Sequence, residues 1–347
     1  MEMDETSLFE KVKLPIAEFN SNALASLVKN QEGGIKGPGF PFSYLASVLQ
    51  FVSEDTKRTV KENILCNFFR SLLELSPNDI AASVNLASNR LPKDSSVNSS
   101  NEGGLGGGTI SKAVREAAGC APDRLRQLYR ETGDLGDAAQ ALLHGQRRLL
   151  AAKKSLSIQE VYTAIREINK EKGIGCEERK RKRIVKMLRI CRGCEPRFLT
   201  RCLLAHVRTG ATFTSVLDAL AAAAAVLEHP GLNGTKLKFQ IKGYQEATRE
   251  VHAAFADPGA VIAALIAGGG PSALRSHCQM RVGTPVRPML AKPCSGVEDM
   301  IQKMKGKVFS CEYKYDGQRC QIHISEETET SSMFSRHLDI MTGKYPD

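Results

Sequence analysis

The sequence predicts an α+β protein of two parts, an all-helical part over residues 1–281 and a second part, residues 282–347, that begins an α/β domain. Three observations predict this division. Apolar residues recur at helical spacing through most of the first 280 residues, three prolines occur within residues 284–293, and apolar and polar residues alternate over residues 308–324. The prolines exclude a helix, so residues 284–293 are expected to form an extended connection.

The helical part divides at short polar or glycine-rich breaks. Residues 42–54 and 57–75 form the first amphipathic pair, and a low-complexity loop is expected over residues 92–109. Ser157 and Glu160 form a capping box for the helix that follows, and the alanine run within residues 212–227 indicates a buried helix. Further helices are predicted over residues 111–118, 122–131, 134–144, 177–190 and 297–305.

The net charge is concentrated in one third of the chain. The protein carries 48 Lys and Arg against 38 Asp and Glu, a net charge of +10. Residues 110–206 contain 22 basic and 11 acidic residues, a net +11, and the remainder, with 26 basic and 27 acidic residues, carries −1. This pattern indicates either a nucleic-acid-binding face or a solvated basic helix surface.

The compartment follows from what the sequence lacks. No secretory signal and no stretch of 18 apolar residues is recognisable, so no membrane association is expected, and the chain belongs in the cytosol or nucleus. Ten cysteines in 347 residues are too few for a disulfide scaffold. Cys191, Cys194, Cys202 and His206 could supply zinc ligands, but packed free thiols are the preferred interpretation.

A candidate reactive lysine lies in the strand-like segment. Period-two alternation predicts one strand before Asp316-Gly317, a hairpin turn at that dipeptide, and a return strand through Ile322 and Ile324. Glu312 and Lys314 would then point to the same side, and a lysine there can act as a nucleophile when its amine is unprotonated. Arg319 would bind an anionic or polyhydroxylated ligand. The alternative is an exposed edge hairpin without a site.

Several segments together resemble the eukaryotic ATP-dependent DNA ligases of the ligase I type. The residues from Lys314 to Arg319 match the KxDGxR motif of covalent nucleotidyltransferases, within FSCEYKYDGQRCQIH. Similar landmarks of that family are RFLTRCLLAHVRTG at 197–210, SHCQMRVGTPVRPML at 276–290, RPMLAKP at 287–293 and FSRHLDIMTGKYPD at 334–347. The resemblance implies a DNA-binding domain over residues 1–281, then the first part of a nucleotidyltransferase (ATP-grasp-like adenylation) domain.

The resemblance also implies residue roles and partners. Lys314 would attack the α-phosphate of ATP, Glu312 would bind the adenine, Arg319 the ribose side, and Arg336 would support the nucleotide pocket. Arg208 and Gly210 would lie on a loop that contacts the DNA backbone. The substrate would be nicked duplex DNA, with Mg²⁺ neutralising charge on the phosphates. A nuclear monomer acting in DNA replication, repair and recombination is expected, and its protein partners are not indicated.

The sequence departs from the family pattern in two ways. His337 replaces the usual asparagine, and the segment LDIM at 338–341 replaces a more polar stretch. Both changes would affect how the nucleotide is positioned. The family's later strands and OB-fold domain would follow Asp347, so the chain is expected to be a fragment that folds poorly after about residue 284 and forms little lysyl-AMP.

Two alternatives remain open. A non-catalytic DNA-binding fragment would bind nicked DNA without covalent nucleotide. An mRNA-capping guanylyltransferase or RNA ligase shares the KxDGxR motif, but the long basic helical part and the PMLA segment argue against it.

Overall fold

The computed structural model describes residues 5–30, 38–90, 105–144, 155–289 and 291–344. The helical part contains α1 (Glu5–Glu10), α2 (Phe42–Glu54), α3 (Arg58–Leu75), α4 (Asp79–Ala87), α5 (Gly107–Ala118), α6 (Pro122–Thr132), α7 (Leu135–Leu143), α8 (Ile158–Lys170), α9 (Cys176–Ile190), α10 (Glu195–Leu203), α11 (Phe213–Glu228), α12 (Gly234–Ala254), α13 (Pro258–Ala267) and α14 (Gly270–His277). Two short strands, β1 (Lys29–Asn30) and β2 (Pro38–Gly39), pair antiparallel. The second part contains α15 (Val297–Met304), β3 (Cys320–Ser325) and β4 (Thr330–Ser335).

The predicted helices are confirmed, with small shifts at their ends. The capping box is present, since the Ser157 hydroxyl accepts from the Glu160 N–H and the Glu160 carboxylate accepts from the Ser157 N–H. The helix predicted from residue 111 begins at Gly107, so Gly107–Thr109 of the expected loop are helical. Most of that loop, residues 92–104, lies outside the described residues.

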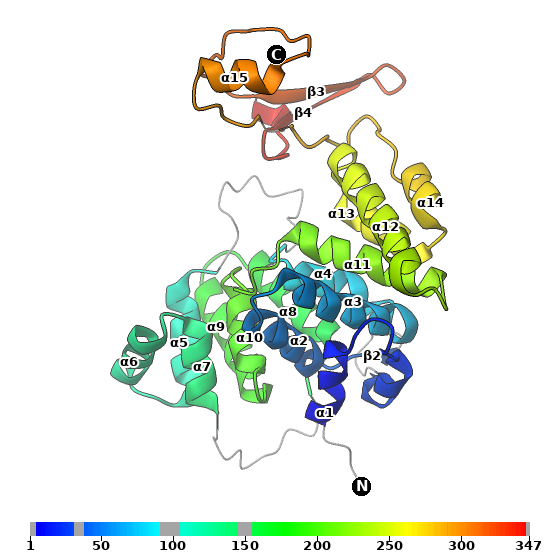
Figure 1. Ribbon diagram of the computed structural model, residues 1–347. Coiled ribbons are helices and arrows are strands. Elements are labelled where there is room, and N and C mark those ends of the chain that lie inside the picture. The colour runs from blue at the N-terminus through cyan, green and yellow to red at the C-terminus, as the bar shows by residue number, and fades with distance from the viewer. Residues whose placement is uncertain (1–4, 31–37, 91–104, 145–154, 290, 345–347) are drawn as a thin grey trace.

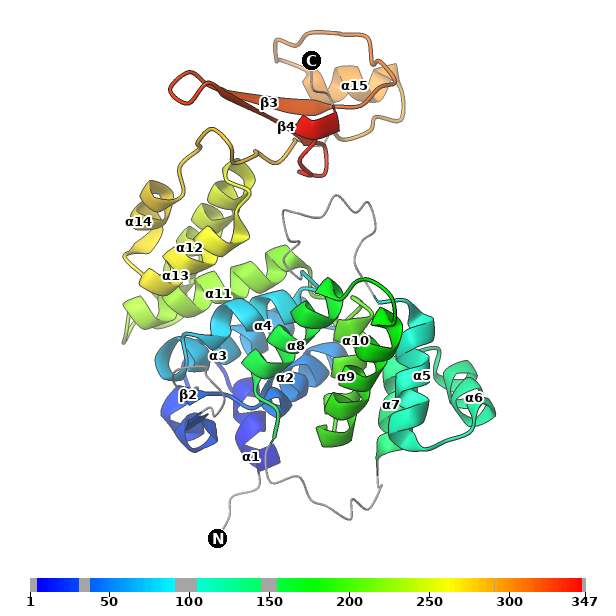
Figure 2. The same cartoon turned by 180° about the vertical axis from the view of Figure 1, so that it is seen from behind.

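A continuous hydrophobic core joins these helices from α1 to the end of α14. Its aromatic centre includes Phe40, Tyr44 and Phe68. The ring centroid of Tyr44 lies 4.9 Å from that of Phe40 and 5.3 Å from that of Phe68. The alanine-rich α11 packs between α3 and α12, because small side chains allow close helix packing. Both views place α5, α6 and α7 at one end of the helical part and α12, α13 and α14 at the other (Figures 1 and 2).

The second part has little core of its own. After Cys278, Phe334 is the one hydrophobic side chain that is buried within the described residues. The extended segment before α15 joins the two parts by hydrogen bonds on both sides. On one side, the Arg287 N–H donates to the Ala253 carbonyl over 3.0 Å; on the other, the Val286 N–H donates to Oε1 of Gln321 in β3, also over 3.0 Å.

The prediction of a strand before Asp316-Gly317 is wrong. Residues 308–319 have no regular secondary structure, and the hairpin instead pairs β3 with β4, with its turn at residues 326–329. A strand needs a partner for its backbone N–H and C=O groups, and alternation of side chains does not supply one. The return strand through Ile322 and Ile324 is confirmed as β3, but both side chains are exposed.

No helix within the described ranges is both long and apolar enough to span a bilayer.

Candidate nucleic-acid interface and nucleotide-binding segment

The loop between α10 and α11 has an unusual backbone. Ala205, Arg208 and Gly210 adopt left-handed conformations, with φ of 53°, 57° and 71°. Glycine adopts this region readily, but alanine and arginine do so at a cost, typically of about 1 kcal/mol each. Such strain persists only when surrounding contacts impose it, and it is frequent at binding sites.

Contacts from α3 and from buried side chains impose the loop conformation. Nζ of Lys61 donates to the Thr209 carbonyl over 2.8 Å. A Cβ at Gly210 would lie 3.2 Å from the same Nζ, so a larger residue there would displace the lysine. Val207 and Thr209 are buried on either side of the exposed Arg208. The loop therefore presents Arg208 outward while its neighbours anchor it.

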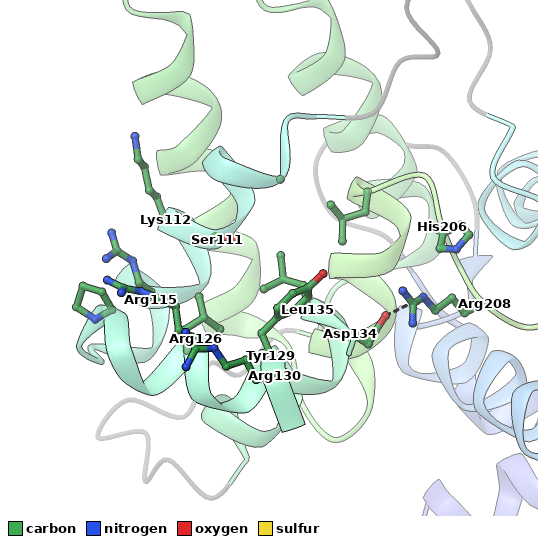
Figure 3. A pocket seen from close by; sticks show the side chains of 14 residues that line it. Ser111, Lys112, Arg115, Arg126, Tyr129, Arg130, Asp134, Leu135, His206 and Arg208 are labelled. Atoms are coloured by element: carbon green, nitrogen blue, oxygen red, sulfur yellow. Dashed lines mark ion pairs between the residues drawn. The ribbon is translucent and has the colours of Figure 1, made fainter. Parts of the chain in front are cut away.

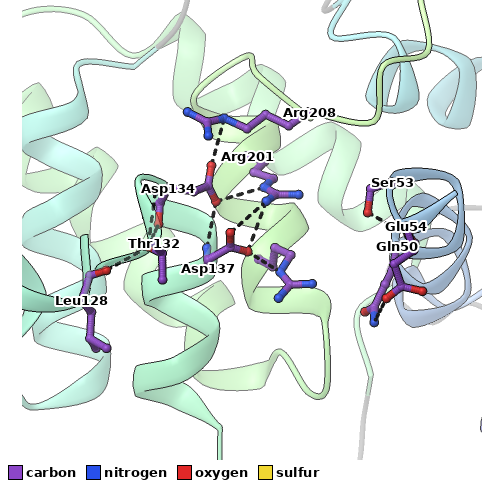
Figure 4. Close-up of polar contacts among 10 residues, drawn as sticks. Gln50, Ser53, Glu54, Leu128, Thr132, Asp134, Asp137, Arg201 and Arg208 are labelled. Atoms are coloured by element: carbon purple, nitrogen blue, oxygen red, sulfur yellow. Dashed lines mark hydrogen bonds and ion pairs between the residues drawn. The ribbon is translucent and has the colours of Figure 1, made fainter. Parts of the chain in front are cut away.

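Arg208 is held by a buried carboxylate (Figure 4). Its Nε lies 3.1 Å from Oδ2 of Asp134, whose side chain is 5% exposed, whereas the Arg208 side chain is 44% exposed. The other carboxylate oxygen, Oδ1, accepts from the Asp137 N–H over 2.8 Å and from Nε of Arg201 over 3.0 Å. Asp134 is thus the N-cap of α7 and also the anchor of Arg208.

The same ion-pair network joins α7 to α10. Asp137 pairs with Arg201 at 3.2 Å and with Arg197 at 2.6 Å. Two carboxylates and three arginines therefore share this junction, and Arg208 is the most exposed of the five (Figure 4). Because Asp134 and Arg201 are both buried, their geometry is set by packing rather than by solvent.

An open cleft adjoins Arg208 (Figure 3). Its lining combines buried apolar side chains, among them Leu125 and Leu135, with a largely exposed basic set that we call the rim. The rim cations come from α5, α6 and the loop, and they are Lys112, Arg115, Arg126, Arg130 and Arg208. The cleft thus brings Arg208 of the loop together with basic residues of α5 and α6.

The basic residues of α9 are largely neutralised by neighbouring carboxylates. Arg183 pairs with Glu167 at 2.6 Å, Lys182 with Glu178 at 2.8 Å, and Arg181 with Glu116 at 3.3 Å. The solvated-surface interpretation therefore fits α9. Of the rim cations, Arg126 pairs with Asp123 at 3.3 Å and Arg208 with Asp134, whereas Lys112, Arg115 and Arg130 have no ion pair within the described residues.

The nucleotide-binding residues predicted from the sequence lie in exposed chain. Glu312, Lys314 and Arg319 belong to the irregular segment 308–319, and all three are exposed. Arg336 follows β4 and is exposed as well. Because Cys320 pairs with Ser335, the hairpin brings Arg319 and Arg336 to the same end. The expected shared face of Glu312 and Lys314 is absent, since that segment is not a strand.

The cysteine cluster is part of the core. Cys191 and Cys202 are buried, burial raises the pKa of the Cys202 thiol to about 12, and Sγ of Cys194 lies 3.7 Å from Oγ of Ser47. His206 lies apart on the cleft lining. Across the described part of the chain, no three His, Cys, Asp or Glu side chains are arranged to hold a metal ion.

Sequence reasoning missed Asp134 and Lys61, and it did not show that basic residues of α5 and α6 share a cleft with Arg208. Asp134 carried a weak signal, because an aspartate directly after Gly133 and before an apolar residue is typical of a helix N-cap. Its contact with Arg208 joins residues 74 positions apart, and no local pattern encodes it.

Comparison with known proteins gives matches over both parts. Residues 41–221 match the family described as DNA ligase N terminus, and residues 288–347 match the ATP dependent DNA ligase domain. DNA ligase 1 of Arabidopsis thaliana is 35% identical over 313 residues, which cover 90% of this chain and 39% of that relative. DNA ligase 6 of the same plant is 35% identical over 316 residues, covering 89% of this chain and 22% of the relative.

A more distant relative extends the same pattern. DNA ligase 1 of Dictyostelium discoideum is 32% identical over 326 residues, covering 90% of this chain and 27% of the relative. The chain therefore spans less than half the length of these relatives. The helical part with its basic loop and the KYDGQR segment are together explained by one assignment: the chain belongs to the ATP-dependent DNA ligase family.

Proposed function

We propose that this chain serves in the ATP-dependent sealing of nicks in duplex DNA, with Lys314 as the nucleophile. The observation that carries the proposal is the position of Lys314 in the KYDGQR motif, inside the segment that matches the ATP dependent DNA ligase domain. The division of labour follows the two parts, with residues 1–281 holding DNA and residues 282–347 contributing to nucleotidyl transfer.

The reaction begins with attack of the unprotonated Lys314 amine on the α-phosphorus of ATP. An N–P bond forms, the bond from the α-phosphorus to the bridging oxygen breaks, pyrophosphate leaves, and the amine loses its proton to solvent. The 5′-phosphate at the nick then takes the AMP group from Lys314. Attack by the adjacent 3′-hydroxyl forms the phosphodiester and releases AMP.

The other residues bind and orient the nucleotide. Glu312 accepts hydrogen bonds from the adenine, and Arg319 and Arg336 bind the ribose side and the pocket wall. The β3–β4 register supports a shared role for the two arginines, because it places them at one end of the hairpin. Mg²⁺ would bind the triphosphate oxygens and neutralise their charge, since this ion prefers phosphate, water and one or two carboxylates to an all-protein cage.

The DNA contact centres on Arg208 and Gly210. Arg208 uses Nε for Asp134 and has no other polar partner within the described residues, so its terminal nitrogens remain available for a phosphate. Gly210 permits the backbone to approach DNA closely. On the basis of the relatives named DNA ligase 1, we propose that the protein acts in the nucleus as a monomer. Its proposed roles are the replication, repair and recombination of DNA.

Covalent labelling tests this function. The protein is incubated with Mg²⁺ and ATP or GTP labelled at the α-phosphate, and the modified residue is mapped by mass spectrometry. We expect acid-labile AMP on Lys314, no label from GTP, and no label on the Lys314→Arg variant, because a guanidinium stays protonated. GMP on Lys314 would indicate a capping enzyme instead, and nick binding without any label would indicate a non-catalytic DNA-binding protein.

A further inference from the structure

A second cluster of basic side chains lies around Phe213, the first residue of α11. It contains Arg90, which follows α4, His252 near the end of α12, and Arg287 in the connecting segment. Neither arginine lies within ion-pair distance of a carboxylate in the part of the chain that the structure describes. Two guanidinium groups thus adjoin one imidazole without a counter-charge.

Packing holds the three side chains near one another. Cζ of Arg90 lies 4.2 Å from the ring centroid of Phe213, and that ring lies 5.1 Å from the ring of His252. The backbone of Arg287 is fixed beside the histidine, since its N–H donates to the carbonyl of Ala253, the residue next to His252. The cluster therefore joins α4, α11, α12 and the connecting segment, which lie together in the tertiary structure alone.

Several polar atoms of the cluster lack partners. His252 is 6% exposed, and neither Nδ1 nor Nε2 has a hydrogen-bond partner; Nε of Arg287 is also buried without one. A buried polar atom without a partner is costly, and native proteins usually satisfy it with protein, water or a ligand. All three atoms can donate to an oxyanion when the imidazole is protonated.

The electrostatics favour an anion at this position. Burial, Arg287 and Arg90 together lower the pKa of His252 to about 4, so the imidazole is neutral in the free protein at physiological pH. Burial likewise lowers the pKa of the Arg287 guanidinium, and burial and Arg287 lower that of Arg90. A bound dianion would reverse these effects by neutralising the arginines and stabilising the imidazolium.

We propose that Arg90, His252 and Arg287 form a binding site for a phosphate oxyanion, separate from the Arg208 loop. The planar guanidinium groups suit a tetrahedral phosphate, and the histidine supplies a third donor on protonation. The phosphate belongs either to the DNA backbone, in which case the site rests on the proposed DNA-binding function, or to a free phosphate or pyrophosphate.

Histidine titration by NMR on the 347-residue protein tests the site without any variant. The ring resonances are followed against pH alone, with inorganic phosphate, and with a nicked duplex, at constant ionic strength, and the His252→Asn variant assigns the signal. We expect phosphate or duplex to raise the pKa of His252 by more than one unit from about 4. An unchanged pKa with both probes would overturn the proposal and leave ordered water as the partner of the ring.

Variants distinguish the two phosphate sources. The Arg90→Gln/Arg287→Gln protein should lose the phosphate-induced shift, whereas the control Lys238→Gln, a charge change on the same helix α12, should retain it. If the ligand is a DNA phosphate, the double variant should also lower the slope of log affinity against log salt by about 0.9. If inorganic phosphate raises the pKa of His252 but the protein does not bind duplex, the phosphate site is supported and the DNA-binding function is rejected.

Discussion

Arg208 and Asp134 form an ion pair in which the cation faces solvent and the anion is buried. Their Nε and Oδ2 atoms lie 3.1 Å apart, and the same carboxylate caps α7 and receives Arg201. The exposed guanidinium is therefore fixed to the start of a helix rather than free on a flexible side chain. The left-handed backbone of Arg208 is held separately, by the contact of Lys61 with the Thr209 carbonyl.

Replacing Asp134 by asparagine should weaken DNA binding about five-fold. Asparagine caps helices as well as aspartate does, so α7 should persist, but the amide holds Arg208 less firmly. Removing a negative charge from a basic surface would by itself strengthen DNA binding, so the predicted sign is opposite to that of bulk electrostatics. Fluorescence anisotropy with a labelled nicked duplex measures the effect.

Asp137→Asn is the matched control for that experiment. It removes the same charge from the same helix, but Asp137 pairs with Arg197 and Arg201, not with Arg208. We expect DNA affinity to be unchanged or slightly higher. In an Arg208→Gln background, Asp134→Asn should no longer weaken binding, and a persistent loss there would disprove the positioning role.

Gly210→Ala should destabilise the protein and weaken DNA binding. The residue has φ of 71°, and a new Cβ would lie 3.2 Å from Nζ of Lys61, which anchors the loop at Thr209. We expect a loss of about 1 kcal/mol in unfolding free energy, measured by denaturant titration. Gly193→Ala is the control, because its φ of 53° imposes similar strain but its Cβ would meet no atom within 4 Å. Gly193→Ala should lower the unfolding free energy without changing DNA affinity. Equal losses of DNA affinity in the two variants would refute the prediction.

DNA binding by the chain should depend steeply on salt and little on sequence. Phosphate contacts release counterions, so each contact contributes about 0.9 to the slope of log affinity against log salt concentration. Arg208→Gln should lower this slope by about that amount and weaken all duplex sequences alike. An affinity that is insensitive to salt, or a loss confined to one sequence, would contradict phosphate recognition by Arg208.

Adenylation of the 347-residue chain should be inefficient. Glu312 and Lys314 lie in an exposed, irregular segment, so the nucleotide is not enclosed and the lysine is not oriented by packing. We expect well under one AMP per chain after incubation with ATP and Mg²⁺, quantified by intact-mass spectrometry, while duplex binding remains normal. Near-stoichiometric labelling would show that these exposed residues assemble an effective site on binding ATP.

His252 should make folding stability sensitive to acid. Its pKa is lowered from about 6.5 to about 4 in the folded protein, so between those values the unfolded chain binds a proton that the native ring does not. This stabilising contribution is present above pH 6.5 and is lost as the pH falls towards 4, up to about 3 kcal/mol. Denaturant unfolding at several pH values should show a shallower acid dependence for His252→Asn than for the unmodified protein. Parallel pH profiles would contradict the assignment.

The sequence by itself determined the helices and the family. Helical spacing, the Ser157–Glu160 capping box and the alanine run of α11 are local signals, and the structure confirms the elements that they predict. The KYDGQR motif carried the family assignment, since its residues are adjacent in the chain. Such features need no knowledge of distant contacts, because they depend on residues within about four positions of one another.

The tertiary structure alone decided the strand pairing and the state of the cations. Residues 308–319 alternate as a strand does, yet no strand pairs with them in the described chain, and β3 pairs with β4 instead. Four of the seven basic residues of α9 pair with carboxylates, whereas Arg208 is anchored by Asp134, 74 positions earlier. Strand partners and ion pairs join distant segments, so the packing of the whole chain fixes them, and a local pattern does not.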